Sequence, residues 1–232
     1  ATQIDEPDEN GHYTGSYFEF DNKRFGDIAE IVDYIDNGNT LASKIAQAEA
    51  ETEQNPTDGQ KEAGNYKKGH VRIGQFDITV ENPKGSVRRG IDQNGKAWET
   101  TMHNTYGYIR GTEGVDGDHI DVFLTDDIDG WNGRRVYVVD QYNEDGSFDE
   151  HKVMLGFNDE DDARSAYFAN YSDDWADNRK IVMTSTNLED FEKWINSSHR
   201  KTKPFAEYKS VPAGETKAIS PADRIAEIDE KM

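Results

Sequence analysis

The chain has 232 residues and a formal net charge of −21 at pH 7. A surface this acidic repels nucleic acid and anionic membranes, so we expect neither as a partner through bulk charge. The absence of cysteine excludes disulfides and thiolate metal ligands, and no apolar run approaches the ~20 residues that a membrane helix needs.

Residues 1–54 are acidic and are expected to form a helical N-terminal appendage. Apolar residues at helical spacing from Phe25 to Ile35, followed by Gly38, predict one helix. A weaker helix is expected from Leu41 to Ala48. Residues 55–70 are expected to be a linker, because they open with turn-forming residues.

From residue 71 the pattern changes to short strands separated by glycine-containing turns. Strands are expected within 71–80, 106–124, 136–140, 148–155 and 181–184, and hairpin turns at 92–95 and 143–147. Asn158 is expected to cap a helix reaching Tyr171, and Thr186 with Glu189 to form the capping box of another. The pattern predicts a small barrel with helices in a domain spanning residues 71–198, followed by a tail over 199–232 with a short helix.

Three carboxylates lie close together at Asp116, Asp118 and Asp121, at the entrance to an apolar strand. Such groups repel one another unless a cation lies between them, and oxygen ligands alone favour Mg²⁺, Mn²⁺ or Ca²⁺. A calcium EF-hand is excluded, because its sixth position requires glycine and Asp121 is found there. Phosphate-binding-loop and His-Glu-x-x-His motifs are absent. The segment predicts a hard-metal site suited to phosphoryl chemistry, with solvated turn carboxylates as the alternative.

Four segments resemble soluble family I inorganic pyrophosphatases, in the same order along the chain. One segment is Tyr106-Gly-Tyr-Ile followed by Asp116-Gly-Asp118-x-x-Asp121. The others are Val80-Glu81-Asn-Pro83, Asp145-x-x-x-x-Glu150-x-Lys152, and Tyr167-Phe-Ala-Asn-Tyr171. Residues 60–89 more specifically resemble the pyrophosphatase-like domain of polyvalent proteins of phages and conjugative elements. Since the chain also starts without Met, we expect it to be part of a larger polypeptide.

The resemblance implies an α+β, mainly β fold: a small closed five-stranded barrel of the oligonucleotide-binding (OB) type with flanking helices. It also implies hydrolysis of pyrophosphate with Mg²⁺, or Mn²⁺, in the cytoplasm of the element's host. Asp118 would take a proton from the attacking water, and Glu81 would order the water and metal shell. By role, the implied residues are, for metal binding, Asp116, Asp121, Asp145 and Glu150; for catalysis, Asp118, Glu81 and Tyr106; and for substrate binding, Arg88, Arg89, Lys152 and Tyr171.

Two positions depart from the family pattern: His119 stands where a proline is expected, and Ser172 where a lysine is expected. The absence of the expected lysine at position 172 weakens a phosphate contact, which leaves two alternatives open. One is a hydrolase of a nucleotide-type diphosphate, and the other is a non-catalytic interaction module on a pyrophosphatase scaffold. His119, His151 and the basic run 199–203 are expected to be surface features. The oligomeric state stays open.

Overall fold

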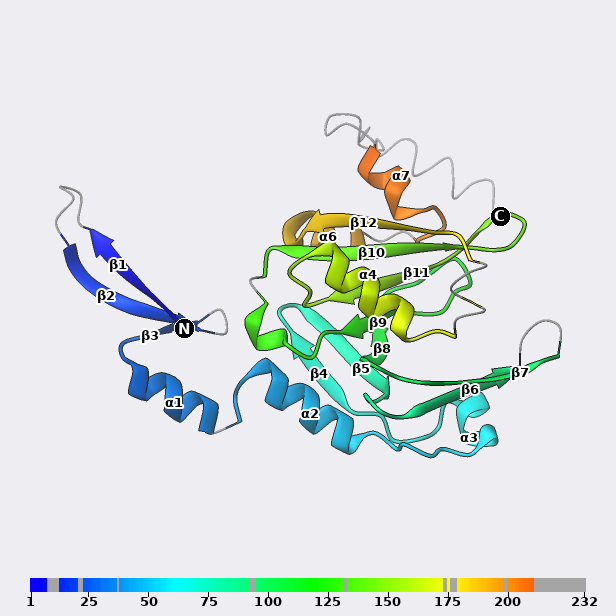
Figure 1. Cartoon of the computed structure of the whole chain (residues 1–232), viewed down its shortest axis with the longest axis horizontal. Coiled ribbons are helices and arrows are strands. Elements are labelled where there is room, and N and C mark those ends of the chain that lie inside the picture. The colour runs from blue at the N-terminus through cyan, green and yellow to red at the C-terminus, as the bar shows by residue number, and fades with distance from the viewer. Residues whose placement is uncertain are drawn as a thin grey trace, which may run out of the picture.

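The computed structural model describes residues 1–7, 13–20, 23–36, 38–91, 95–131, 133–172, 175, 179–197 and 200–210. Its largest element is a seven-stranded sheet with the order β12-β10-β11-β9-β8-β5-β4 (Figure 1). All neighbouring strands pair antiparallel except β9 and β11, which run parallel. The strands are β4 (His70–Ile73), β5 (Phe76–Asn82), β8 (Thr105–Ile109), β9 (Ile120–Leu124), β10 (Arg135–Tyr142), β11 (Phe148–Leu155) and β12 (Ile181–Asn187).

The expected closed five-stranded barrel is wrong. Strands β4 and β12 stand at the two ends of the strand order and are not paired with each other. Strands β6 (Val87–Ile91) and β7 (Ala97–Thr101) pair only with each other, as a separate hairpin. Turn spacing predicts how many strands the chain contains, but closure depends on pairing between strands distant in sequence, which local pattern does not encode.

The N-terminal region contains strands that the expected helical appendage does not include. Strands β1 (Thr2–Pro7), β2 (Tyr13–Phe20) and β3 (Lys23–Phe25) form a three-stranded sheet. Helix α1 (Ile28–Asp36) follows, and Figure 1 shows this sheet set apart from the rest of the chain. The short helix α3 (Asp58–Ala63) lies in the expected linker and begins with a capping box between Thr57 and Gln60. The domain boundaries stay a prediction.

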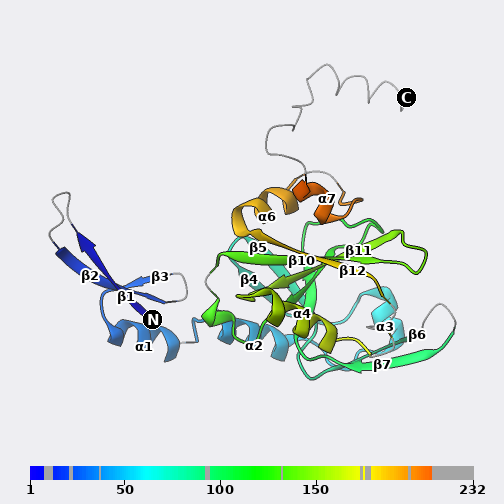
Figure 2. The ribbon, with the colours of Figure 1, turned by 45° about the horizontal axis from the view of Figure 1, so that its top comes forward.

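The large sheet buries apolar side chains on both faces. One face packs against α2 (Leu41–Glu51), α6 (Leu188–Ile195) and α7 (Phe205–Ser210), through residues such as Ile45, Phe191 and Phe205. In Figure 2, α6 and α7 lie together near β10 and β12, whereas α2 lies near β4. The other face packs against α4 (Glu160–Ala169), where Tyr167 meets Phe123.

The two expected helix caps each fall one residue later than predicted. Asp159 rather than Asn158 caps α4, and Asn187 rather than Thr186 caps α6. Each side chain accepts a hydrogen bond from the backbone N–H three residues on, which satisfies a donor that the first helical turn leaves free. The short 3₁₀ helix η1 (Ile128–Gly130) lies between β9 and β10 in the chain. Within the ranges that the structure describes, no helix is long and apolar enough to span a membrane.

Residues 200–210, here called the C-terminal strap, are anchored by two buried polar groups of the sheet. Asp140 of β10 accepts hydrogen bonds from the backbone N–H groups of Phe205 (2.8 Å) and Ala206 (3.0 Å). His151 of β11 lies opposite Asp140, and its Nε2 donates to the carbonyl oxygen of Lys203 (3.1 Å). Both sheet side chains are 0% exposed. The expectation that His151 is a surface residue is therefore wrong, because strand alternation places it with Val153 and Leu155 on the helix-covered face.

The protein should lose stability as the pH falls from about 6.5 to about 4, because the buried His151 must stay neutral. Burial lowers the pKa of His151 to about 4; the Lys203 carbonyl opposes this shift and Lys201 adds to it. The unfolded chain binds its proton near the ordinary value of about 6.5, so the stabilisation is complete above that pH and is lost below it. A shift of this size corresponds to about 3 kcal/mol. Burial raises the pKa of the facing Asp140, and its protonation offsets part of the loss.

The variant His151→Phe separates this effect from the titration of surface carboxylates. Phenylalanine keeps an aromatic ring against Phe148 and Trp194 but does not titrate. Urea unfolding at pH 7 and pH 4.5 should show a smaller decline in the free energy of unfolding for the variant than for the wild type. An equal decline in both proteins would mean that another group carries the acid sensitivity.

Candidate active site

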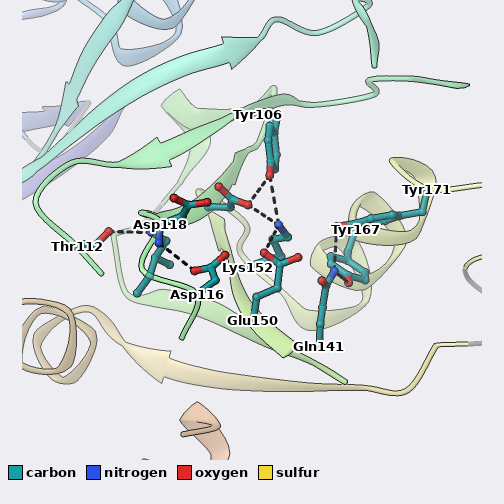
Figure 3. Close-up of polar contacts among 11 residues, drawn as sticks. Tyr106, Thr112, Asp116, Asp118, Gln141, Glu150, Lys152, Tyr167 and Tyr171 are labelled. Atoms are coloured by element: carbon teal, nitrogen blue, oxygen red, sulfur yellow. Dashed lines mark hydrogen bonds and ion pairs between the residues drawn. The ribbon is translucent and has the colours of Figure 1, made fainter. Parts of the chain in front are cut away.

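Lys152 lies at the centre of a cluster of polar side chains on the α4 side of the sheet. Its ammonium group pairs with the carboxylates of Asp121 and Glu150, the latter at 2.7 Å, and lies 3.3 Å from the hydroxyl oxygen of Tyr106 (Figure 3). The Lys152 side chain is only 4% exposed. Register explains the contacts: Lys152 pairs with Asp121 across the parallel ladder, and Glu150 precedes it by two residues on the same face.

Tyr106 projects from β8 toward the Lys152 ammonium (Figure 3). Its hydroxyl donates a hydrogen bond to Asp121, and its ring packs against Phe123 at a centroid distance of 4.9 Å. The Arg88 guanidinium carbon lies 4.7 Å from the centre of the same ring. Burial raises the pKa of Tyr106, although Lys152 opposes the shift. The hydroxyl is therefore a neutral hydrogen-bond donor throughout the ordinary pH range.

The two carboxylates of this cluster share the Lys152 ammonium and also interact with the Arg88 guanidinium. Burial alone lowers the pKa of Lys152, but Asp121, Tyr106 and Glu150 reverse the shift and raise it well above its ordinary value. Lys152 is therefore always charged. Burial raises the pKa of Glu150, and neighbouring Asp121 adds to this despite the opposing charge of Lys152. A further cation near Glu150 would favour the charged form of this carboxylate.

The loop carrying Asp116 and Asp118 is exposed and is organised by its own hydrogen bonds. The backbone N–H of Asp118 donates to Asp116 Oδ1 (3.0 Å), and the N–H of Gly114 donates to the carbonyl oxygen of Asp118 (2.7 Å). In the view of Figure 3, both carboxylates lie to one side of Lys152. Among the described residues, no three carboxylate or imidazole groups converge on a common metal position.

His119 fixes the base of this loop. Its Nδ1 lies 2.7 Å from the carbonyl oxygen of Thr112, and its ring stacks on Tyr108 at 4.8 Å. The Thr112 hydroxyl in turn accepts a hydrogen bond from the N–H of Ile120 (2.9 Å). The expected proline would restrict the backbone through its ring. Here side-chain hydrogen bonds and stacking restrain the same position.

Asp145 and Arg89, two other predicted site residues, make contacts of a structural kind. Asp145 lies in the exposed turn between β10 and β11 and accepts hydrogen bonds from the hydroxyl (2.6 Å) and backbone N–H (2.9 Å) of Ser147. These bonds lower its pKa. Arg89 pairs with Glu99 across the exposed β6–β7 hairpin at 2.7 Å. Strand alternation gives Arg88 the opposite direction, toward Tyr106.

Glu81 lies on β5 at a break in register with β8, beside the pair formed by Asn82 and Tyr106. Its carboxylate accepts a hydrogen bond from Lys68 at 2.6 Å. The Lys68 ammonium also lies over the rings of Tyr66 and Tyr108, at 4.7 and 5.3 Å. Sequence reasoning missed Lys68, which lies within the expected linker. The signal that could have identified Lys68 is the short basic segment that contains it in an otherwise acidic chain.

Tyr171 follows the end of α4, and the side-chain amide of Gln141 donates to its hydroxyl at 3.0 Å. Gln141 also hydrogen-bonds Tyr167, and the ring of Tyr171 stacks on Trp175 at 3.8 Å. Burial raises the pKa of Tyr171 although Lys152 opposes the shift, so its hydroxyl stays protonated. Sequence reasoning missed Gln141, which lies opposite Glu150 in the β10–β11 register.

Comparison with known proteins identifies the family of the chain. A family model described as inorganic pyrophosphatase matches residues 58–196, more than half of the chain. No curated protein matches. The solved structures that match include an inorganic phosphatase from Anaplasma phagocytophilum, an inorganic pyrophosphatase from Coxiella burnetii, and one from Helicobacter pylori. Their sequence identities are 16%, 15% and 18%, with TM-scores of 0.33, 0.32 and 0.27. The matches cover 52%, 51% and 51% of this chain and 88%, 89% and 87% of the respective structures. On the extent of the family-model match, the chain belongs to the inorganic pyrophosphatase family.

Proposed function

We propose that the chain hydrolyses inorganic pyrophosphate to two phosphates with the help of Mg²⁺, or Mn²⁺. Its family membership supports the reaction. The observation that carries the proposal is the Lys152 cluster, in which two carboxylates face one cationic centre beside several phosphate-binding donors. Carboxylate oxygens are the hard ligands that these metals prefer.

The donor chemistry of the predicted ligands fits a divalent metal. Asp121 and Glu150 already converge on a cation, the Lys152 ammonium. In the proposal they hold the metal together with Asp116 from the neighbouring loop, and Asp145 holds a further one brought by substrate. When bound, the metal supplies charge neutralisation and lowers the pKa of a bound water.

Four side chains of the cluster are suited to binding the phosphate oxygens. Lys152 and Arg88 carry fixed positive charge, since the pKa of each is raised by its acidic and phenolic neighbours after burial has lowered it. The hydroxyls of Tyr106 and Tyr171 are neutral donors. Hydrogen bonds from such donors to an anion are strongest where water is excluded, as around buried Tyr106.

Asp118 is proposed as the general base. Its exposed side chain makes none of the ion pairs found for the described residues and faces solvent from which a water can approach. The water oxygen forms a bond to one phosphorus, Asp118 takes the proton, and the bridging P–O bond breaks to release phosphate. Glu81, already engaged with Lys68, orders the surrounding polar groups.

A second candidate function is hydrolysis of a nucleotide-type diphosphate. Two observations favour it. The ring of Tyr171 stacks on that of Trp175, and Ser172 stands where the family carries lysine. An aromatic surface beside the phosphate-binding donors is suited to a base, which an inorganic substrate lacks.

One assay separates these functions. Purified protein should release phosphate from pyrophosphate with Mg²⁺ and Mn²⁺, and more slowly from nucleoside di- and triphosphates. Faster release from the nucleotides would favour the second function. No release with any divalent metal, together with no metal binding by calorimetry, would leave the non-catalytic interaction module as the remaining function.

We also propose that the domain belongs to the polyvalent proteins of phages and conjugative elements and acts in the host cytoplasm. The resemblance of residues 60–89 to that group supports this assignment. Mass spectrometry of the native polypeptide in cells carrying such an element would test it, because it predicts a product larger than 232 residues.

A further inference from the structure

We propose that Arg200 is a positioning residue that holds the Asp116–Asp118 loop in the conformation needed for metal binding. The inference rests on the proposed function, because that function makes the loop a metal ligand. It concerns a residue of the C-terminal strap that the sequence pattern placed in the basic surface run 199–203.

The Arg200 guanidinium contacts the loop through its backbone. Nε donates to the carbonyl oxygen of Gly114 (2.9 Å) and Nη2 to that of Val115 (2.6 Å). The next residue along the strap continues the contact, since the N–H of Lys201 donates to the carbonyl oxygen of Glu113 (2.9 Å). Three successive carbonyl groups immediately before Asp116 are therefore bound by the strap. Hydrogen bonds from a charged donor are stronger than neutral ones.

The strap itself is fixed to the folded core. The Lys201 ammonium donates to the carbonyl oxygen of Ser197 (2.9 Å) and lies 5.7 Å from the ring centre of Trp194. Phe205 is 0% exposed, and Asp140 accepts from its backbone N–H. The backbone of Arg200 is therefore part of an ordered segment, so binding the loop costs only the conformational freedom of the side chain.

Gly117 fits this arrangement. Its φ of +93° belongs to a conformation that favours glycine. A Cβ at this position would also lie 3.3 Å from Arg200 Nη2. The glycine between the two aspartates thus permits both the turn and the close approach of the guanidinium.

The charge of Arg200 also opposes repulsion within the loop. Its Nε lies 3.5 Å from a carboxylate oxygen of Glu113, and Asp116 and Asp118 follow closely in sequence. Without the guanidinium, like charges and the loss of two hydrogen bonds would broaden the range of loop conformations. The cost should fall on metal binding, because metal bound at saturation through Asp116 would restore the order of the loop and of Asp118, and the phosphate-binding donors of the Lys152 cluster lie outside the loop.

The variant Arg200→Ala should therefore raise the Mg²⁺ concentration for half-maximal activity by about 10-fold, equivalent to about 1.4 kcal/mol. At saturating Mg²⁺ the kcat should stay within about threefold of wild type, and the KM for pyrophosphate should change little. Arg200→Lys should recover part of the metal affinity, because one ammonium can still bind a carbonyl. Amide hydrogen exchange of residues 113–118 should become faster in Arg200→Ala and intermediate in Arg200→Lys.

A matched control is Lys209→Ala on the same strap, which removes a 3.0 Å contact with Asp190 away from the loop. It should leave both the metal dependence and the loop exchange unchanged. Unchanged loop exchange and metal dependence in Arg200→Ala would overturn the proposal, as would an equal effect of Lys209→Ala. If the wild type hydrolyses no diphosphate, the proposed function fails, whereas exchange and Mg²⁺ calorimetry still decide whether Arg200 orders the loop.

Discussion

Replacing Lys152 by methionine should lower the stability of the metal-free protein by about 3 kcal/mol or more and reduce hydrolysis at saturating Mg²⁺ by about 100-fold or more. Methionine keeps much of the side-chain volume, so the loss comes from the ammonium. Asp121 and Glu150 are only 19% and 33% exposed. They would face each other without their shared cation, and the substrate would lose a charged donor.

The affinity for Mg²⁺, unlike stability and hydrolysis, should not fall in this variant. The Lys152 ammonium occupies the position between the two carboxylates, so a metal must bind against its charge. Without it, Mg²⁺ should bind at least as tightly as in the wild type and recover much of the lost stability, because a ligand that binds only the folded state stabilises it.

Urea unfolding with and without Mg²⁺, combined with calorimetry, measures both effects. Lys193→Met is a suitable control, since it removes an exposed ion pair with Glu189 on α6, and such pairs contribute little to stability. Weaker Mg²⁺ binding in Lys152→Met, without loss of metal-free stability, would show that the carboxylates do not form a cation site.

Local patterns predicted the elements near the site better than the way they come together. Short apolar segments separated by glycine-containing turns located β5, β10 and β11, and the helix caps were predicted to within one residue. The Lys152 cluster requires β9 and β11 to lie parallel and in register. Nothing in either strand alone specifies that pairing; the family resemblance suggested that Asp121 and Lys152 share a site. The roles of the predicted site residues stay a prediction.

Contacts that involve backbone groups could not be predicted from the sequence. Arg200 binds carbonyl oxygens of the loop, and Asp140 binds N–H groups of the strap. Every residue carries such groups, so these partners leave no mark in the residue types of the segments that they hold. The polarity of His151 alone favours a surface position, but strand alternation buries its side chain. Lys68 is recognisable only once Glu81 and two tyrosine rings are seen around it.

Replacing Asp118 by asparagine should reduce hydrolysis by about 10²–10⁴-fold, the range typical for loss of a general base. Asparagine has nearly the same shape but cannot take the proton. The Asp118 side chain is exposed, and the hydrogen bonds of this residue to Gly114 and Asp116 use its backbone, which the substitution retains. The free energy of unfolding should therefore stay within about 0.5 kcal/mol of the wild type.

Unlike Lys152→Met, the variant Asp118→Asn should lose activity without losing stability. Phosphate release and urea unfolding should be measured on both Asp118→Asn and Asp161→Asn, an exposed change on α4 that removes the same charge. Only Asp118→Asn should lose activity, and neither variant should unfold at a lower urea concentration than the wild type. The loss should appear in kcat rather than in the KM for pyrophosphate, because a general base acts in the transition state. If Asp118→Asn kept wild-type kcat, the proton would have another acceptor, and the proposed role of Asp118 would be wrong.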